Sequence, residues 1–89
     1  MFLVLYSPGA GKALKKMPKE TAKRVVESIE ALSRVDDPKL YIKKLKGSFG
    51  VPIYSYRVGD YRVILSVNEE ILTIYIIDVG DRSTIYRNY

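Results

Sequence analysis

The stretch YSYRVGDYRVILSV, residues 54–67, constrains the fold of this chain more than any other feature. Apolar and polar residues alternate on both sides of Gly59-Asp60, and a two-residue loop of this type between alternating runs is typical of a β-hairpin. In such a hairpin Arg57 lies directly opposite Arg62. The sequence therefore predicts an antiparallel unit that brings two arginines together on one face.

The segments that flank this hairpin are assigned by hydrophobic periodicity. The short apolar run 2–7, rich in β-forming residues and closed by a Pro-Gly pair, predicts a first strand. Apolar residues at helical spacing predict two helices between Pro8 and about Val35, interrupted at Pro18. Three further strands are expected at 51–58, 60–67 and 71–79. The tail RSTIYRNY is expected to be irregular or a final strand.

This order of elements predicts an α+β fold in a single domain spanning residues 1–89. We expect an N-terminal strand, a helical hairpin, and an antiparallel sheet of three to four strands with the helices on one face. Alternation assigns ten residues to the face that packs on the helices, although a one-residue slip at the turn after Val67 would reverse the last three. They are Tyr54, Tyr56, Val58, Tyr61, Val63, Leu65, Val67, Leu72, Ile74 and Ile76. The open face then carries Ser55, Arg57, Arg62, Ile64 and Ser66, with Thr73 and Tyr75 beside Arg62.

The composition excludes several kinds of chemistry. The 89 residues include no cysteine and no histidine, which removes disulfides, thiolate nucleophiles and the commonest general base and metal ligand. No apolar run approaches the ~20 residues of a membrane span, and nothing resembles a signal peptide. We therefore expect a soluble, cytoplasmic protein with no metal, small-molecule cofactor or membrane partner. The net charge of +5 favours a polyanionic partner, although a basic surface can also be merely solvated.

A basic segment follows the second predicted helix. Its lysines are interleaved with aromatic residues, and this mixture suits RNA, because cations bind phosphates while aromatic rings stack on bases. A solvated loop is the alternative interpretation. The lysines are Lys39, Lys43, Lys44 and Lys46, and the aromatic residues are Tyr41 and Phe49.

Two further features do not predict a ligand site. The string GAGK, residues 9–12, lacks both the first glycine of a P-loop and the Ser/Thr after its lysine. Asp78 and Asp81 flank a glycine near Arg82 and could approach a metal ion, but no third ligand is evident in the sequence. Pairing with arginine is therefore the favoured role of these two carboxylates.

Two motifs in this order resemble a known family. They are R-x-G-D-Y-R at 57–62 and V-G-x-R-x-x-x-Y at 79–86, preceded by KLKG at 44–47. Together with the start YSPGAGKALKKMPKE, they resemble the RelE/ParE toxin superfamily, and within it the RelE branch of mRNA interferases. The resemblance covers nearly the whole chain and implies the same order of elements that periodicity predicts.

The resemblance implies a type II toxin that acts as a ribosome-dependent mRNA endoribonuclease and inhibits translation. RelE-like toxins enter the ribosomal A site, where the ribose 2′-OH attacks the adjacent phosphate without a metal ion, and a cognate antitoxin blocks them. Carried over by position, the resemblance implies three catalytic residues: Arg62 at the phosphate, Arg82 at the leaving group or the developing charge, and Tyr86 in stacking or proton transfer. It also implies RNA binding by Arg57 and by the basic segment with Lys43, Lys44 and Lys46.

The sequence departs from the family at positions that matter for chemistry. Many members have His or Lys where this chain has Asp81, and several have lysines where it has Ile53 and Ser55. No strong general base is therefore evident, and catalysis is expected to rest on positioning and on arginine charge. Two alternatives remain: a ParE-like toxin that poisons DNA gyrase without nuclease activity, and a non-catalytic module that binds RNA or an antitoxin. The arginine pair with Tyr86 favours the nuclease.

Overall fold

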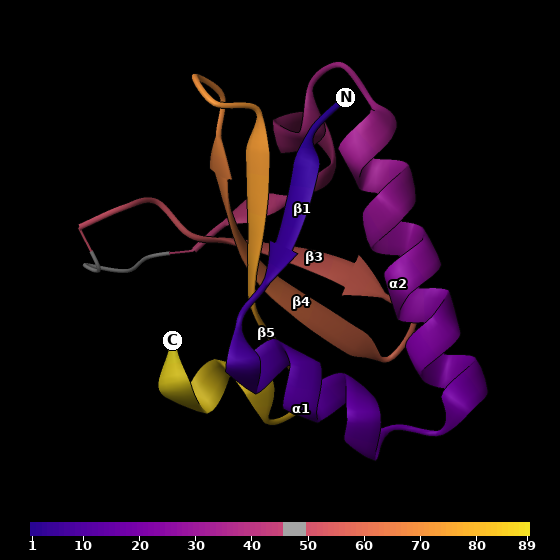
Figure 1. Ribbon diagram of the computed structural model, residues 1–89. Helices are drawn as coiled ribbons and strands as arrows, with labels where there is room; N and C mark the ends of the chain where they lie inside the picture. The colour runs from indigo at the N-terminus through magenta and orange to yellow at the C-terminus, as the bar shows by residue number, and fades with distance from the viewer. Residues whose placement is uncertain (46–49) are drawn as a thin grey trace.

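The computed structural model describes residues 1–45 and 50–89 of the chain (Figure 1). The elements are β1 (Leu3–Tyr6), α1 (Pro8–Lys16), α2 (Lys19–Arg34), the 3-10 helix η1 (Pro38–Tyr41), β2 (Lys43–Lys44), β3 (Tyr54–Val58), β4 (Tyr61–Asn68), β5 (Thr73–Asp81) and the 3-10 helix η2 (Ile85–Asn88). The predicted α+β fold, with its N-terminal strand, two helices and following sheet, is confirmed. None of the described helices combines the length and apolar character needed to cross a membrane.

The strands form one mixed sheet of five, in the order β1-β5-β4-β3-β2. The three long C-terminal strands are antiparallel neighbours, as predicted. β1 joins them at the edge of β5 and runs parallel to it, with Leu3 opposite Thr73. The opposite edge is the two-residue strand β2, which lies in the basic segment, where no strand was predicted. These two short edge strands extend the expected sheet of three to four strands to five.

A serine cap and two prolines determine where the helices begin. Ser7 caps α1, because its hydroxyl accepts a hydrogen bond from the Ala10 amide at 3.0 Å, and Pro8 occupies the first turn. The same Ser7 hydroxyl donates to the Ile77 carbonyl at 2.6 Å, which ties the start of the helix to β5. Pro18 then separates α1 from α2. In Figure 1, α1 lies across the lower end of the sheet and α2 runs alongside it.

The main core lies between the helices and one face of the sheet. Its most deeply buried members are Ala10 of α1, the α2 residues Val25, Ile29 and Leu32, and the strand residues Val63, Leu65, Ile74 and Ile76. The prediction for Leu72 is wrong: this side chain is 48% exposed, and its backbone has φ of 48°. The Asn68 side chain accepts hydrogen bonds from the amides of Glu70 and Ile71, so the turn is longer than expected and β5 starts at Thr73.

This longer turn also changes what lies beside the arginines. Thr73 pairs with Asn68 and Tyr75 pairs with Ser66, so neither lies next to Arg62, contrary to expectation. Gly80 occupies the position opposite Arg62 instead. The register shifts between Ile64 and Leu65, where an irregularity interrupts the ladder.

The C-terminal tail is a 3-10 helix, not a final strand. It folds back on the open face of the sheet, where Ile85 is buried in a small second cluster with Ile53 and Ile64. Gly80 permits this approach, because a Cβ atom at that position would lie 2.6 Å from the Ile85 Cδ1 atom. Packing of one isoleucine therefore places the last residues of the chain beside the hairpin arginines.

Candidate active site on the open face of the sheet

The β3–β4 hairpin brings Arg57 and Arg62 into direct cross-strand register, as the sequence predicts. Gly59 has φ of 59°, a left-handed conformation that glycine adopts without strain, and the two-residue turn depends on it. Arg57 is exposed, and its Nε atom donates to the Gly59 carbonyl at 3.3 Å. The hairpin therefore concentrates two positive charges at one corner of the open face.

Arg62 is the more constrained of the two arginines. Its side chain is partly buried, and its Nε atom is inaccessible to solvent with no hydrogen-bond partner among the described residues. The guanidinium carbon lies 6.0 Å from the centroid of the Tyr86 ring, at the outer limit of a cation–π contact. An unpaired donor in a buried position is costly, and an oxyanion is the partner that a guanidinium binds most strongly.

Tyr86 reaches this corner from η2. Its ring faces Arg62, while its hydroxyl oxygen lies 2.6 Å from the hydroxyl oxygen of Ser55 on β3. Ser55 is only 2% exposed, whereas Tyr86 remains 37% exposed. Alternation places Ser55 on the open face, but no feature of the sequence predicts this hydrogen bond, because it depends on how the tail folds back.

Arg82 follows β5 directly, and its backbone is tied to the hairpin turn. The Arg82 amide donates to the Asp60 carbonyl at 2.9 Å, so the end of β5 lies beside the Gly59-Asp60 turn. The Arg82 side chain is exposed. The backbone thus brings Arg57, Arg62 and Arg82 to one corner of the sheet, and the role of each side chain stays a prediction.

Among the described residues, the two aspartates near this corner are held by hydrogen bonds, and the nearby charge of Arg82 also helps to lower the pKa of the Asp81 carboxyl. Asp78 accepts hydrogen bonds from the Val79 amide at 2.8 Å and from the Tyr89 hydroxyl at 3.2 Å. Asp81 accepts from both the hydroxyl and the amide of Ser83, and these hydrogen bonds lower the pKa of its carboxyl below the ordinary value. Asp81 is therefore ionised at neutral pH and is a weak general base.

The lysines of the basic segment are divided by the fold. Lys43 of β2 is exposed and pairs with Ser55 of β3, so it belongs to the same face as the arginines. Lys44 is exposed as well but alternates to the other face, opposite Tyr54. Lys39 is engaged elsewhere, because its Nζ atom lies 2.7 Å from a carboxylate oxygen of Glu69. Lys46 lies outside the described residues, as does Phe49.

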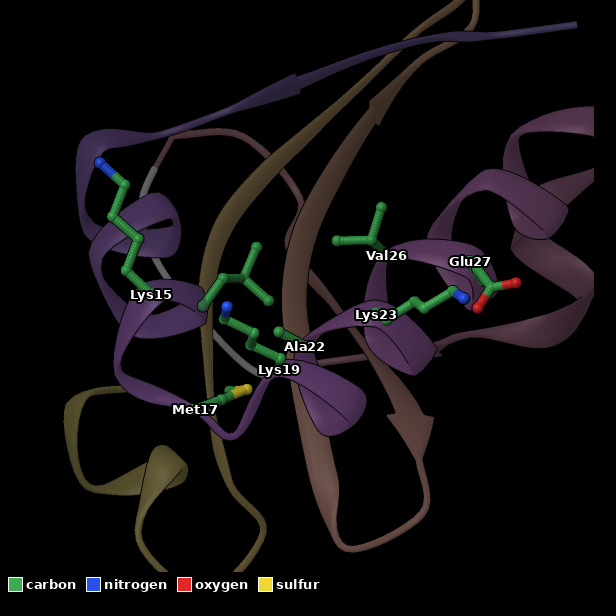
Figure 2. A pocket seen from close by; sticks show the side chains of 8 residues that line it. Lys15, Met17, Lys19, Ala22, Lys23, Val26 and Glu27 are labelled. Atoms are coloured by element: carbon green, nitrogen blue, oxygen red, sulfur yellow. The ribbon is translucent and has the colours of Figure 1, made fainter.

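A separate apolar groove lies where α1 meets α2 (Figure 2). Its floor is formed by Leu14, Met17, Ala22 and Val26, and its rim carries Lys15, Lys19, Lys23 and Glu27. Three lysines to one glutamate make this rim strongly positive. The groove is distinct from the arginine corner, which lies on the opposite face of the sheet from the helices.

The sequence and the overall fold both match one family of proteins. The sequence profile described as "ParE toxin of type II toxin-antitoxin system, parDE" matches residues 4–86. The chain therefore belongs to the RelE/ParE superfamily of type II toxin–antitoxin toxins, and the resemblance to this superfamily is confirmed.

Several individual relatives that are similar to the chain are RelE toxins. It is 36% identical over 86 residues to toxin RelE3 of Methanocaldococcus jannaschii, and the alignment covers 93% of each chain. Its structure is similar to one chain of the archaeal RelE–RelB complex from Pyrococcus horikoshii, with 32% identity, a TM-score of 0.75, and coverage of 93% of this chain and 97% of that one. The toxin–antitoxin complex RelBE2 from Mycobacterium tuberculosis gives 29% identity, a TM-score of 0.78 and 92% coverage of each chain.

Proposed function

We propose that this protein is a ribosome-dependent mRNA endoribonuclease that inhibits translation. The observation that carries the proposal is the pairing of Arg57 with Arg62 beside Tyr86, on an open face, in a chain similar to RelE toxins. The substrate is mRNA in the ribosomal A site. The ribose 2′-oxygen forms a bond to phosphorus while the bond to the 5′-oxygen breaks, which leaves a 2′,3′-cyclic phosphate and a 5′-hydroxyl.

Each side chain has a distinct part in this reaction. Arg62 stabilises the charge that develops on the phosphorane-like oxygens, because its guanidinium offers several N–H donors in one plane. Arg82, beside the same corner, stabilises the departing 5′-oxygen. Arg57 is exposed and contributes to RNA binding together with Lys43 on the same face. Tyr86 stacks on the RNA or moves a proton through its hydroxyl.

The weak base at this corner explains the dependence on the ribosome. With no histidine in the sequence, and with hydrogen bonds lowering the pKa of Asp81, none of the described residues at this corner abstracts the 2′-proton efficiently near neutral pH. Rate must come from charge stabilisation and from holding the RNA with its 2′-oxygen in line with the leaving group. The ribosome supplies that geometry.

The test compares two substrates. Purified protein is incubated with an mRNA alone and with ribosomes programmed with the same mRNA, and the cut ends are mapped by primer extension. We expect clear cleavage on ribosomes and little on naked RNA. Efficient cutting of free RNA contradicts the ribosome-dependent mechanism, and cutting of neither substrate contradicts nuclease function altogether.

A second candidate function is supported by the family description itself, which names ParE. In that case the protein poisons DNA gyrase and has no nuclease activity. A supercoiling assay with purified gyrase separates the two: inhibition of gyrase without mRNA cleavage favours the ParE-like function. A protein inactive in both assays, yet able to bind RNA or an antitoxin, is the non-catalytic module.

We also propose that a cognate antitoxin covers the lysine-rimmed groove between α1 and α2. A partner helix with apolar anchors flanked by carboxylates matches its apolar floor and positive rim. The candidate partner is the product of the neighbouring gene, co-expressed with the toxin. Val26→Asp should weaken the complex by at least about tenfold, because it buries a charge in the apolar floor. Ala31→Asp, an equal charge change at an exposed position of α2 outside the groove, is the matched control; equal weakening by both variants contradicts this docking site.

A further inference from the structure

We propose that Ser55 is a positioning residue, whose buried hydroxyl holds Tyr86 in the place from which it faces Arg62. The inference rests on the proposed nuclease function for its consequence, but not for the contact itself. Ser55 and Tyr86 come from β3 and η2, 31 positions apart in the sequence, and their hydroxyl oxygens are 2.6 Å apart. This is a short hydrogen bond for two hydroxyl groups.

The surroundings of Ser55 indicate why a polar residue occupies this position. Ser55 is the second residue of β3, it is 2% exposed, and its partner on β4 is the fully buried Ile64. Placing a hydroxyl in such a site is unfavourable unless the group forms a hydrogen bond. Tyr86 supplies that bond. An apolar side chain would pack equally well at this position of β3. The hydrogen bond to Tyr86 is therefore the reason for a hydroxyl at position 55.

A second anchor acts on the neighbouring residue. Ile85 is 6% exposed and packs with Ile53 and Ile64, in the space that Gly80 leaves open. This anchor fixes the backbone of η2, but it leaves the Tyr86 side chain free to change its rotamer. The hydrogen bond to Ser55 removes that freedom, because it fixes the far end of the phenol ring.

The fixed ring matters because of what lies next to it. The centroid of the Tyr86 ring lies 6.0 Å from the guanidinium carbon of Arg62, whose Nε atom is buried. A ring that left this position would expose Arg62 to water and lose its own alignment with bound RNA. Holding both side chains before the substrate arrives lowers the entropy lost on the way to the transition state. Ser55 thus acts through Tyr86, without touching the reacting atoms.

The experiment is a double-mutant cycle with Ser55→Ala and Tyr86→Phe, measured as single-turnover cleavage on saturating programmed ribosomes. Loss of one hydrogen bond predicts a fall of about 3- to 10-fold for Ser55→Ala, with half-saturation by ribosomes unchanged. In the Tyr86→Phe background, Ser55→Ala should change the rate by less than about 2-fold, because the bond is already absent. Ser66→Ala, which removes a hydroxyl from the same face beside Tyr75, is the control with an unchanged rate.

A measurement independent of activity separates this proposal from the proposed function. In protein labelled with 13C at tyrosine Cζ, the Tyr86 resonance is identified as the one missing in Tyr86→Phe, and it should shift in Ser55→Ala but not in Ser66→Ala. If the wild-type protein cleaves no mRNA but this shift is seen, the nuclease function fails and the contact stands. An unshifted resonance, an unchanged rate in Ser55→Ala, or equal losses in both tyrosine backgrounds overturns the positioning role.

Discussion

Replacing Arg62 by methionine removes its charge and keeps most of its stem, which separates the two contributions of this side chain. The stem is partly buried, so alanine would also remove packing and confuse loss of charge with loss of structure. Methionine is flexible and packs favourably against an aromatic ring, here Tyr86. Arg62→Met therefore tests the guanidinium alone.

The expected effects on cleavage and on stability have different signs. Loss of one transition-state charge contact should slow single-turnover cleavage by about 10²-fold or more, equivalent to about 2.7 kcal/mol. Stability should hold or rise, because the variant relieves the repulsion of Arg57, about 1 kcal/mol for two charges ~5 Å apart in water. The variant also removes a buried donor that has no partner among the described residues, which is stabilising. The cation–π attraction that it loses is worth about 0.5–1 kcal/mol.

The assay measures cleavage on programmed ribosomes and thermal melting on the same preparations. For a chain of 89 residues, a gain of about 1 kcal/mol raises the melting temperature by roughly 4–8 °C. Arg82→Ala should lose cleavage on the same scale as Arg62→Met, and Arg57→Ala should lose less, because it acts in binding. Arg34→Met is the matched control, since it removes one charge from an exposed ion pair with Glu30 at the far end of α2.

Two results would refute this reasoning. Cleavage that stays within about threefold of wild type in both Arg62→Met and Arg82→Ala shows that the reacting phosphate lies elsewhere. Cleavage that is lost only together with a fall in melting temperature shows that Arg62 is a structural residue, and that its charge plays no part in the reaction.

Substitutions at four other positions have expected outcomes that melting and cleavage measurements can check. Gly80→Ala should destabilise the tail and slow cleavage, because its Cβ meets Ile85, whereas Gly11→Ala, which meets nothing within 4 Å, should stabilise α1 by up to about 1 kcal/mol. Burial raises the pKa of Tyr56, so the neutral form favours the fold and its contribution is lost as pH rises above about 10; melting of Tyr56→Phe should depend less on alkaline pH. Hydrogen bonds lower the pKa of Asp81 from 3.8, so its contribution is present above that pH and lost as pH falls through the folded-state value; Asp81→Asn should melt with less dependence on acid.

Local chemistry made much of this fold predictable. The Gly59-Asp60 turn determines the register of β3 and β4, so the pairing of Arg57 with Arg62 could be predicted without any long-range information. The two helices could also be predicted from local features, because each has one apolar stripe and a proline at its start.

Features that depend on tertiary packing were missed. The parallel pairing of β1 with β5 depends on how the helices return the chain, and periodicity carries no information about it. The start of β5 depends on two hydrogen bonds that the Asn68 side chain accepts from backbone amides, which lengthen the turn and expose Leu72. The contact between Ser55 and Tyr86 depends on the packing of Ile85, so the sequence indicated both residues without indicating that they meet.

The parallel pairing of β1 with β5 also determines when the arginine corner can be completed during synthesis of the chain. The hydrogen bond from Ser7 to Ile77 joins residues 70 positions apart, and the arginine corner is completed only by Arg82 and Tyr86. Pairings this distant are slow to form, and they cannot form before the last strand has been synthesised. A growing chain therefore has a free N-terminal strand and an unfinished corner until its final residues leave the ribosome that makes it. Synthesis of the chain is in this way separated in time from completion of the arginine corner.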